Sequence, residues 1–209
     1  MSAVTTTDVA SQARRRIVDA HSHMWQANTP ERPWIPGTRP QLPEPFTIER
    51  VVPMIEEACV DRVIIVPPTL EGDRLDYGQE AVKRYPGRFG IMGLINLADP
   101  TTAQRFPAWR EQSGVLGIRL NIAGEQARWL TDGTADWFWP AAEKAGIPVM
   151  FLTTGQTPRF AVIAQRHPQL TFIIDHMGVS SQTLRNGKLP EAVIQSASRP
   201  RSRNILMFR

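Results

Sequence analysis

The sequence predicts an α/β fold with a parallel sheet at its centre. Short apolar runs rich in β-branched residues alternate along the chain with segments whose apolar residues recur at helical spacing. The runs are nearly continuous, as expected of strands covered on both faces. Several end at polar residues, among them His21, His23, Arg119 and His176. These observations indicate strand–helix–strand units whose polar side chains gather at one edge of the sheet.

Seven runs bounded by glycine, proline or polar residues are predicted to be strands. They cover residues 17–20, 62–66, 89–97, 115–120, 147–152, 170–175 and 204–208. Helical patterns fill the gaps over residues 47–59, 77–85, 101–112, 135–145, 158–166 and 189–197. Thr47 is a suitable N-cap for the first helix, and Cys59 near its end is expected to pack rather than to act as a nucleophile.

The alternation of these elements fits one domain over residues 16–209, preceded by a disordered polar tail over residues 1–15. Right-handed crossovers between parallel strands are compatible with a doubly wound sheet and with a closed barrel. No Gly-x-Gly-x-x-Gly follows the first run, which makes a dinucleotide-binding domain the less favoured choice.

Composition narrows the class of function. The net charge is +4 and the pI about 9.8, but the basic residues are mostly scattered, so a nucleic-acid-binding protein is not favoured. The same charge balance suits a small anionic substrate. One cysteine excludes an intrachain disulfide. The chain shows neither a signal-peptide pattern nor a run of about 18 apolar residues, so we expect a cytoplasmic protein without membrane contact.

Three histidines are candidates for chemistry. His21 and His23 follow the first strand, where alternation in an extended segment points both rings to one side and allows them to grip one metal ion or one substrate. His176 follows the sixth strand and reaches the same rim. Asp19 and Asp175 each lie beside a histidine and are suited to orient an imidazole or carry a proton. His167, in a turn at the opposite end, is expected to be structural.

Arg119 ends the fourth strand and requires an anionic partner, because a buried guanidinium keeps its charge. A bidentate clamp on a substrate carboxylate is favoured over a salt bridge to Asp175. We assign substrate binding to Trp25, Asn121 and Thr153 as well. Trp25 opens a proline-rich segment that we expect to form a long ordered loop over the first strand.

Four segments in order resemble the amidohydrolase-related family of metal-dependent hydrolases, which includes sugar lactonases, pyrone-dicarboxylate lactonase and related decarboxylases. They are Val18 to His23, Gly117 to Leu120, Gly146 to Val149 and Pro168 to Gly178, and the resemblance covers about residues 16–180. It implies a (β/α)8 TIM-barrel-like fold. It also implies that His21 and His23 bind a divalent metal such as zinc or, in metal-free lactonases, polarise the substrate. By the same resemblance, His176 completes the rim and Arg119 holds a carboxylate or ring oxygen.

Two departures from the family pattern shape the expectation. The fifth strand ends in Phe151-Leu152-Thr153-Thr154 without the family's histidine, which favours a metal-poor or metal-free centre. The family's general base is an aspartate at the end of an eighth strand, and about seven strands are predicted before Arg209. We therefore expect an incomplete barrel, truncated at its C-terminus and missing its last strand and helix.

The predicted function is hydrolysis of a small, acidic or sugar-derived lactone or cyclic ester, with water attacking at the histidine-rich rim. A metal-dependent carboxy-lyase is the alternative enzyme. An inactive barrel that only binds ligand is the alternative outside catalysis. The expected partner is a small-molecule substrate, with homo-oligomer formation left open.

Overall fold

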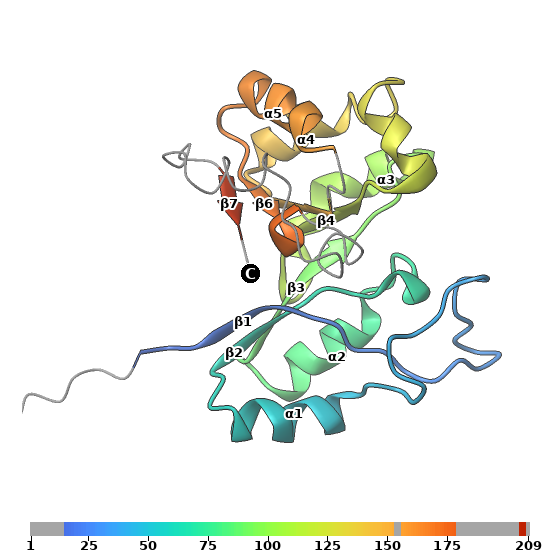
Figure 1. Cartoon of the computed structure of the whole chain (residues 1–209), viewed down its shortest axis with the longest axis vertical. Helices are drawn as coiled ribbons and strands as arrows, with labels where there is room; N and C mark the ends of the chain where they lie inside the picture. Colours follow the sequence, from blue (N-terminus) through green and yellow to red (C-terminus); the bar gives the residue numbers. More distant parts are fainter. Residues whose placement is uncertain (1–14, 153–155, 179–204, 208–209) are drawn as a thin grey trace, which may run out of the picture.

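The computed structural model describes residues 15–152, 156–178 and 205–207 and contains a parallel sheet of seven strands. Each strand lies beside its neighbour in sequence, so the order is β1 to β7 without reversal (Figure 1). The strands are β1 (Val18–Ser22), β2 (Arg62–Ile65), β3 (Phe89–Leu94), β4 (Val115–Asn121), β5 (Val149–Leu152), β6 (Phe172–Ile174) and β7 (Ile205–Met207). This order is that of a barrel and excludes the doubly wound alternative, whose strand order reverses part-way.

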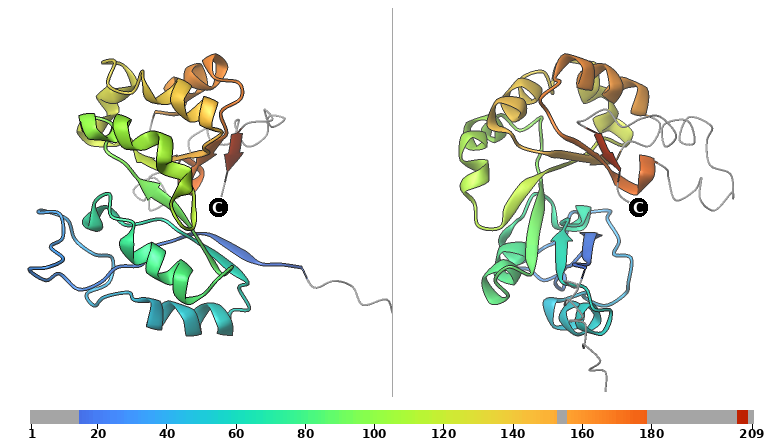
Figure 2. Two further views of the ribbon diagram at one scale, coloured as in Figure 1. Left: turned by 180° about the vertical axis from the view of Figure 1, so that it is seen from behind. Right: turned by 90° about the vertical axis from the view of Figure 1, so that its left-hand side faces the viewer.

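Helices cover the outer face of the sheet, which curls into an open half-barrel (Figure 2). They are α1 (Ile48–Glu57), α2 (Asp76–Arg84), α3 (Pro100–Arg105), α4 (Phe138–Ala145) and α5 (Thr157–Arg166). The incomplete (β/α) barrel expected from the sequence is therefore confirmed. The helix predicted over residues 189–197 and the tail predicted over residues 1–15 lie outside the described residues, apart from Arg15. No helix in the described ranges has the length and hydrophobicity required to cross a bilayer.

Two sequence predictions differ from the structure. The helix expected over residues 101–112 divides into α3, which Asp99 caps by accepting a hydrogen bond from the Thr101 backbone amide, and a 3₁₀ helix over Phe106–Glu111. Cys59 was expected to pack, but α1 ends at Glu57 and Cys59 is exposed in a left-handed conformation with φ 55°. Periodicity alone did not detect this helix end, because an apolar residue continued the pattern past it.

Alternate residues of a strand point to opposite faces of the sheet, so the burial pattern of β4 shows which side chains lie on each face. On β4, Ile118 and Leu120 are fully buried in the larger core beneath the helices. Arg119, between them, consequently faces the inside of the half-barrel. A small apolar cluster packs within the half-barrel and consists of Val66, Met92, Met150 and Ile173. Arg119 and Asn121 lie toward the carboxyl end of β4.

Close approach of neighbouring strands restricts position 117. A Cβ atom on Gly117 would lie 2.5 Å from the backbone oxygen of Pro148 and 2.7 Å from Cε of Met92. Real Cβ atoms do not approach backbone this closely, so only glycine fits here without displacing β5. Gly117 thus sets the distance between β5 and the strand that carries Arg119.

Aromatic side chains fill the core between the helices and β4 to β6. Phe138 is fully buried, and the rings of Phe151 and Phe160 stack with centroids 3.7 Å apart. Trp129 and Trp139 are also buried.

Phe138→Ala is expected to lower the free energy of unfolding by about 3–5 kcal/mol, because it leaves a cavity under α4. Urea unfolding followed by circular dichroism measures this loss. Val162→Ala on the exposed side of α5 is the control and should change stability by less than about 1 kcal/mol. Equal effects of the two substitutions would contradict the assigned core.

Candidate active site

A bulge in β1 positions the first histidine. Asp19 pairs with Val63 and Ser22 with Ile65, so β1 contains one residue more than β2 over this interval. The carboxylate of Asp19 accepts a hydrogen bond of 3.0 Å from the backbone amide of His21. Bulges commonly redirect a side chain near a functional site. Here the bulge and Asp19 together fix the backbone from which the His21 ring projects.

The rings of His21 and His23 face each other at the rim. Their Nε2 atoms lie 3.4 Å apart, and the ring centroids lie 4.8 Å apart. Nδ1 of His23 lies 2.6 Å from the backbone oxygen of Val66, which assigns the ring proton to Nδ1. Burial, with help from the charges of His21 and Arg119, lowers the pKa of His23 to about 4 despite the bond to Val66. His23 is consequently neutral near pH 7 and has a lone pair on Nε2.

A buried ion pair lies directly below His21. Nε of Arg119 donates a 2.8 Å hydrogen bond to Oδ2 of Asp175, and the two side chains are 5% and 1% exposed. The other carboxylate oxygen, Oδ1, lies 3.4 Å from Nδ1 of His21. Burial alone would raise the pKa of Asp175, but the hydrogen bond from His21 and the charge of Arg119 hold it below its usual range. Asp175 is therefore a carboxylate shared between Arg119 and His21.

This ion pair is the salt bridge that the sequence analysis ranked second. Arg119 was expected to clamp a substrate carboxylate, whereas Asp175 is its hydrogen-bond partner among the described residues. The reason is that Arg119 on β4 and Asp175, directly after β6, both reach the inner face, with only β5 between the two strands.

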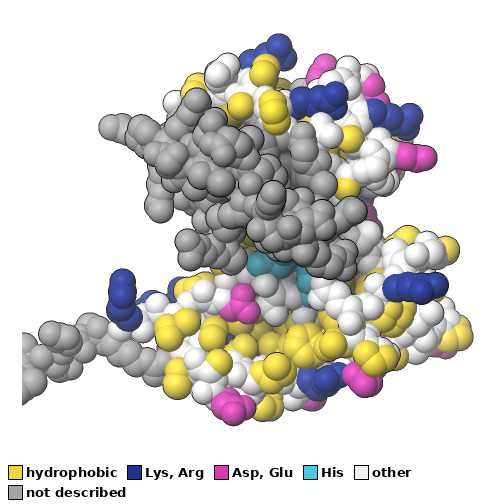
Figure 3. Space-filling model, in the orientation of Figure 1, with side chains coloured by type: hydrophobic (Ala, Val, Ile, Leu, Met, Phe, Trp, Pro, Cys, Tyr) yellow, Lys and Arg dark blue, Asp and Glu magenta, His cyan; other side chains and the backbone are white. Residues whose placement is uncertain are grey.

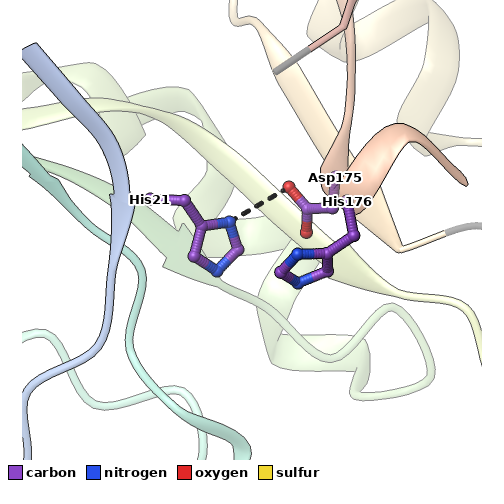
Figure 4. A group of neighbouring side chains, drawn as sticks. All are labelled: His21, Asp175 and His176. Atoms are coloured by element: carbon purple, nitrogen blue, oxygen red, sulfur yellow. Dashed lines mark ion pairs between the residues drawn. The ribbon is translucent and has the colours of Figure 1, made fainter. Parts of the chain in front are cut away.

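His176 completes the cluster from the other side (Figure 4). It lies in a 3₁₀ turn over Asp175–Gly178 and has φ 48°, an uncommon conformation for a residue with a side chain. Its ring centroid lies 4.8 Å from that of His21, so the two rings flank Asp175. Burial and the charge of His21 lower the pKa of His176. Histidine side chains are visible at the waist between the two halves of the molecule (Figure 3).

A cleft of about 550 Å³ opens at the same rim, over the carboxyl ends of β3 and β4. Its lining consists of Ile35, Thr69, Gly72, Asp73, Leu94, Ile95, Asn96, Ala98, Asp99, Asn121, Glu125, Gln126, Arg128 and Trp129. Of the predicted substrate-binding residues, Asn121 lines this cleft. Trp25 is only 2% exposed and packs on Phe46 with a centroid distance of 5.5 Å. Thr153 lies outside the described residues.

The long loop after β1 is ordered as expected and is fixed by Arg32. The guanidinium binds the buried carboxylate of Glu71 through Nε and Nη2, at 3.2 and 2.5 Å. It also binds Asp76 at the start of α2, at 2.9 and 3.0 Å. The loop thereby holds Ile35 against the cleft, with the Ile35 amide bonded to the Leu70 oxygen at 2.8 Å. Sequence reasoning missed Arg32 and Glu71, because their pairing joins positions 39 residues apart.

His167, the fourth histidine, lies away from this rim. Its Nδ1 is 2.9 Å from a carboxylate oxygen of Glu143, which connects the end of α5 to α4. This contact supports the structural role expected from the sequence.

The histidine pair fits a divalent metal. Two nitrogen ligands about 2.0–2.1 Å from a tetrahedral zinc ion are about 3.3–3.4 Å apart, and the two Nε2 atoms are separated by 3.4 Å. Each ring has an acceptor at its Nδ1 side, Asp175 for His21 and the Val66 oxygen for His23, as is usual behind metal-binding histidines. His21, Asp175 and His176 also offer ligand atoms within 4.8 Å of one another. Arg119 satisfies the charge of Asp175, so we favour the His21–His23 pair as the metal-binding atoms.

The sequence profile of the amidohydrolases matches residues 18–202. The chain belongs to the amidohydrolase family. It is 25% identical over 168 residues to L-fucono-1,5-lactonase of Burkholderia ambifaria, an alignment that covers 76% of this chain and 56% of the lactonase.

Solved amidohydrolase structures share the fold. A probable 2-pyrone-4,6-dicarboxylic acid hydrolase of Acinetobacter baumannii, with citric acid bound, superposes with a TM-score of 0.62 at 16% identity and covers 78% of this chain and 59% of its own. A zinc-bound amidohydrolase of Burkholderia multivorans gives 0.66 at 17% identity, over 92% of this chain and 69% of its own. The chain thus spans little more than half the length of the lactonase and of the pyrone-dicarboxylate hydrolase.

Arg119→Met is expected to destabilise the protein by about 3–5 kcal/mol, because it leaves the Asp175 carboxylate buried without its cation. The double variant Arg119→Met with Asp175→Leu should recover most of this loss. Urea unfolding measures both. Arg50→Met, which removes an exposed pair with Glu44, is the control and should cost less than about 1 kcal/mol. A single variant as stable as the wild type would disprove the structural role of the pair.

His23 makes stability depend on pH. The unfolded chain gains a proton at His23 near pH 6.5, whereas the folded chain does so only near pH 4. The contribution of neutral His23 is complete above pH 6.5 and is lost as the pH falls toward 4. In chelator-treated protein, His23→Gln should therefore reduce the loss of stability between about pH 7 and about pH 4.5, measured by urea unfolding. An unaltered slope in His23→Gln would contradict the burial of His23.

Proposed function

We propose that the histidine cluster hydrolyses the carbonyl–oxygen bond of a small lactone or cyclic ester. The observation that carries the proposal is the convergence of His21, His23 and His176 at the rim of the half-barrel, at which a cleft of about 550 Å³, lined by other residues, also opens. The cleft is large enough for one small molecule, and the three imidazoles come from the edge strand β1 with the residues after it and from the turn that follows β6. The lactonase relative agrees with this reaction class.

The roles of the histidines follow from their partners. Asp175 and the Val66 oxygen accept from the Nδ1 sides of His21 and His23, so both Nε2 lone pairs point into the 3.4 Å space between the rings. Two lone pairs at this distance repel unless a proton or cation lies between them. We infer that this shared positive charge polarises the substrate carbonyl oxygen. When bound between these atoms, zinc would supply this charge as a Lewis acid.

His176 is the proposed proton carrier. It is exposed, it flanks His21, and its lowered pKa makes it neutral and able to accept a proton near pH 7. Water attacks the carbonyl carbon and gives one proton to His176. The ring carbon–oxygen bond then breaks, and the same proton passes to the leaving oxygen. The product is a hydroxy acid that contains all the atoms of the lactone and of one water molecule.

A metal-dependent carboxy-lyase is the second candidate. It is favoured by the fit of the His21–His23 pair to zinc, and 5-carboxyvanillate decarboxylase of Sphingomonas paucimobilis shares the fold with a TM-score of 0.60 at 15% identity. This alignment covers 92% of this chain and 80% of the decarboxylase. Release of carbon dioxide from an aromatic acid, without acid release from any lactone, would establish this candidate and reject hydrolysis.

Hydrolysis is tested by acid release from a panel of lactones in a pH-stat, with protein prepared with zinc and with chelator. His21→Asn and His176→Asn are each expected to lower kcat/KM by about 10²-fold or more, since each removes a group at the reacting centre. His167→Asn changes a histidine away from the rim and should keep wild-type activity. No acid release from any lactone under either condition, or equal activity of all three variants, would reject the proposal.

A further inference from the structure

We propose that the cleft over β3 and β4 binds a hydroxyl-rich, uncharged part of the substrate and selects against carboxylated lactones. This inference rests on the proposed hydrolysis at the histidine cluster, since it assigns the other end of the same substrate. It names a binding site that the cluster itself does not define.

Strand geometry connects the cleft to the cluster. Asn121 lies two residues after Arg119 on β4, so both face the inside of the half-barrel. Leu94, which also lines the cleft, pairs in register with Arg119 on the neighbouring strand. The cleft therefore continues the surface on which Arg119, Asp175 and His21 lie. A lactone with its carbonyl at the histidines can extend its substituents toward Asn121.

The polar lining is rich in hydrogen-bond acceptors. It contains three carboxylates, Asp73, Asp99 and Glu125, and three amides, Asn96, Asn121 and Gln126. Carboxylates only accept hydrogen bonds, whereas hydroxyl groups donate and accept. Trp129 and Ile35 add apolar surface on which the carbon–hydrogen faces of a ring can pack. This combination matches a ring that bears several hydroxyl groups.

Cations near the cleft are already paired. Nε of Arg128 lies 3.6 Å from a carboxylate oxygen of Asp132. Arg105 lies 3.6 Å from Asp73 and 3.7 Å from Asp99. Arg119, nearer the histidines, is bound to Asp175. Among the described lining residues of the cleft, three carboxylates outnumber the single cation, Arg128, so the lining carries a net negative charge that disfavours a substrate carboxylate.

Asn121 supplies a specific reason for ligand binding. Its Oδ1 atom is buried and has no hydrogen-bond partner. An unpaired buried acceptor costs about 1–3 kcal/mol. Because the amide lies at the cleft wall, a turn of the side chain toward a ligand hydroxyl would remove this cost. A hydroxylated ligand gains from this contact, and a bare ring does not.

Three probes test the substrate class: δ-valerolactone as a bare ring, glucono-1,5-lactone as a neutral polyhydroxylated ring, and 2-pyrone-4,6-dicarboxylate as a doubly charged ring. We expect kcat/KM for gluconolactone to exceed that for the bare ring by about tenfold or more, mainly through KM, and the dicarboxylate to be the poorest substrate. Asn121→Leu and Glu125→Gln should each reduce the ratio of gluconolactone to valerolactone. Glu111→Gln makes the same chemical change at an exposed position outside the cleft and should leave the ratio unchanged.

The outcomes separate the inference from the proposed function. Equal kcat/KM for the bare and hydroxylated rings, or a preference for the dicarboxylate, would overturn the assigned cleft while hydrolysis stands. Failure to hydrolyse any probe would reject hydrolysis alone. The cleft is then judged by calorimetry with the neutral, unreactive polyol 1,5-anhydroglucitol. Saturable binding by the wild type that weakens in the folded Glu125→Gln variant supports the cleft, and no binding by the wild type overturns it.

Discussion

Arg119 and Asp175 form a charged pair inside an otherwise apolar half-barrel, and the geometry of the rim depends on it. The guanidinium cannot lose its proton, so it requires a carboxylate at the same depth, and β6 supplies one across β5. Asp175 in turn faces Nδ1 of His21 at 3.4 Å and so constrains the ring whose opposite nitrogen faces His23. One buried interaction thereby connects the fourth and sixth strands to the histidines at the end of the first.

The same pair affects recognition. Because its charge is matched within the protein, Arg119 brings little net attraction for a substrate carboxylate, and the neighbouring cleft presents carboxylates of its own. In the proposed reaction, a proton or cation between the two Nε2 atoms, which lie 3.4 Å apart, supplies the positive charge that polarises the carbonyl oxygen. The proposed polarising centre and the acceptor-rich cleft differ in character, because the charge of the buried guanidinium is neutralised within the protein.

Much of the fold and part of the site could be predicted from the sequence. Strand positions and the rim location of His21, His23 and His176 could be predicted, because they follow from the local periodicity of apolar and polar residues along the sequence. The ion pair of Arg119 with Asp175 was ranked second, because its partner lies 56 residues away and pairing between strands leaves no local pattern. The cleft was not foreseen either, since it is assembled from the ends of β3 and β4 and from the segments that follow β1, β2, β3 and β4.

The contact between Gly117 and the Pro148 oxygen has a consequence for variants of this chain. Any side chain at 117 would push apart β4 and β5 and so displace the guanidinium two residues later. Such a variant would be scored in a genetic screen as a catalytic lesion, although position 117 belongs neither to the histidine cluster nor to the lining of the cleft. A map of loss-of-function alleles would therefore include substitutions below the rim, where the backbones of β4 and β5 lie close together.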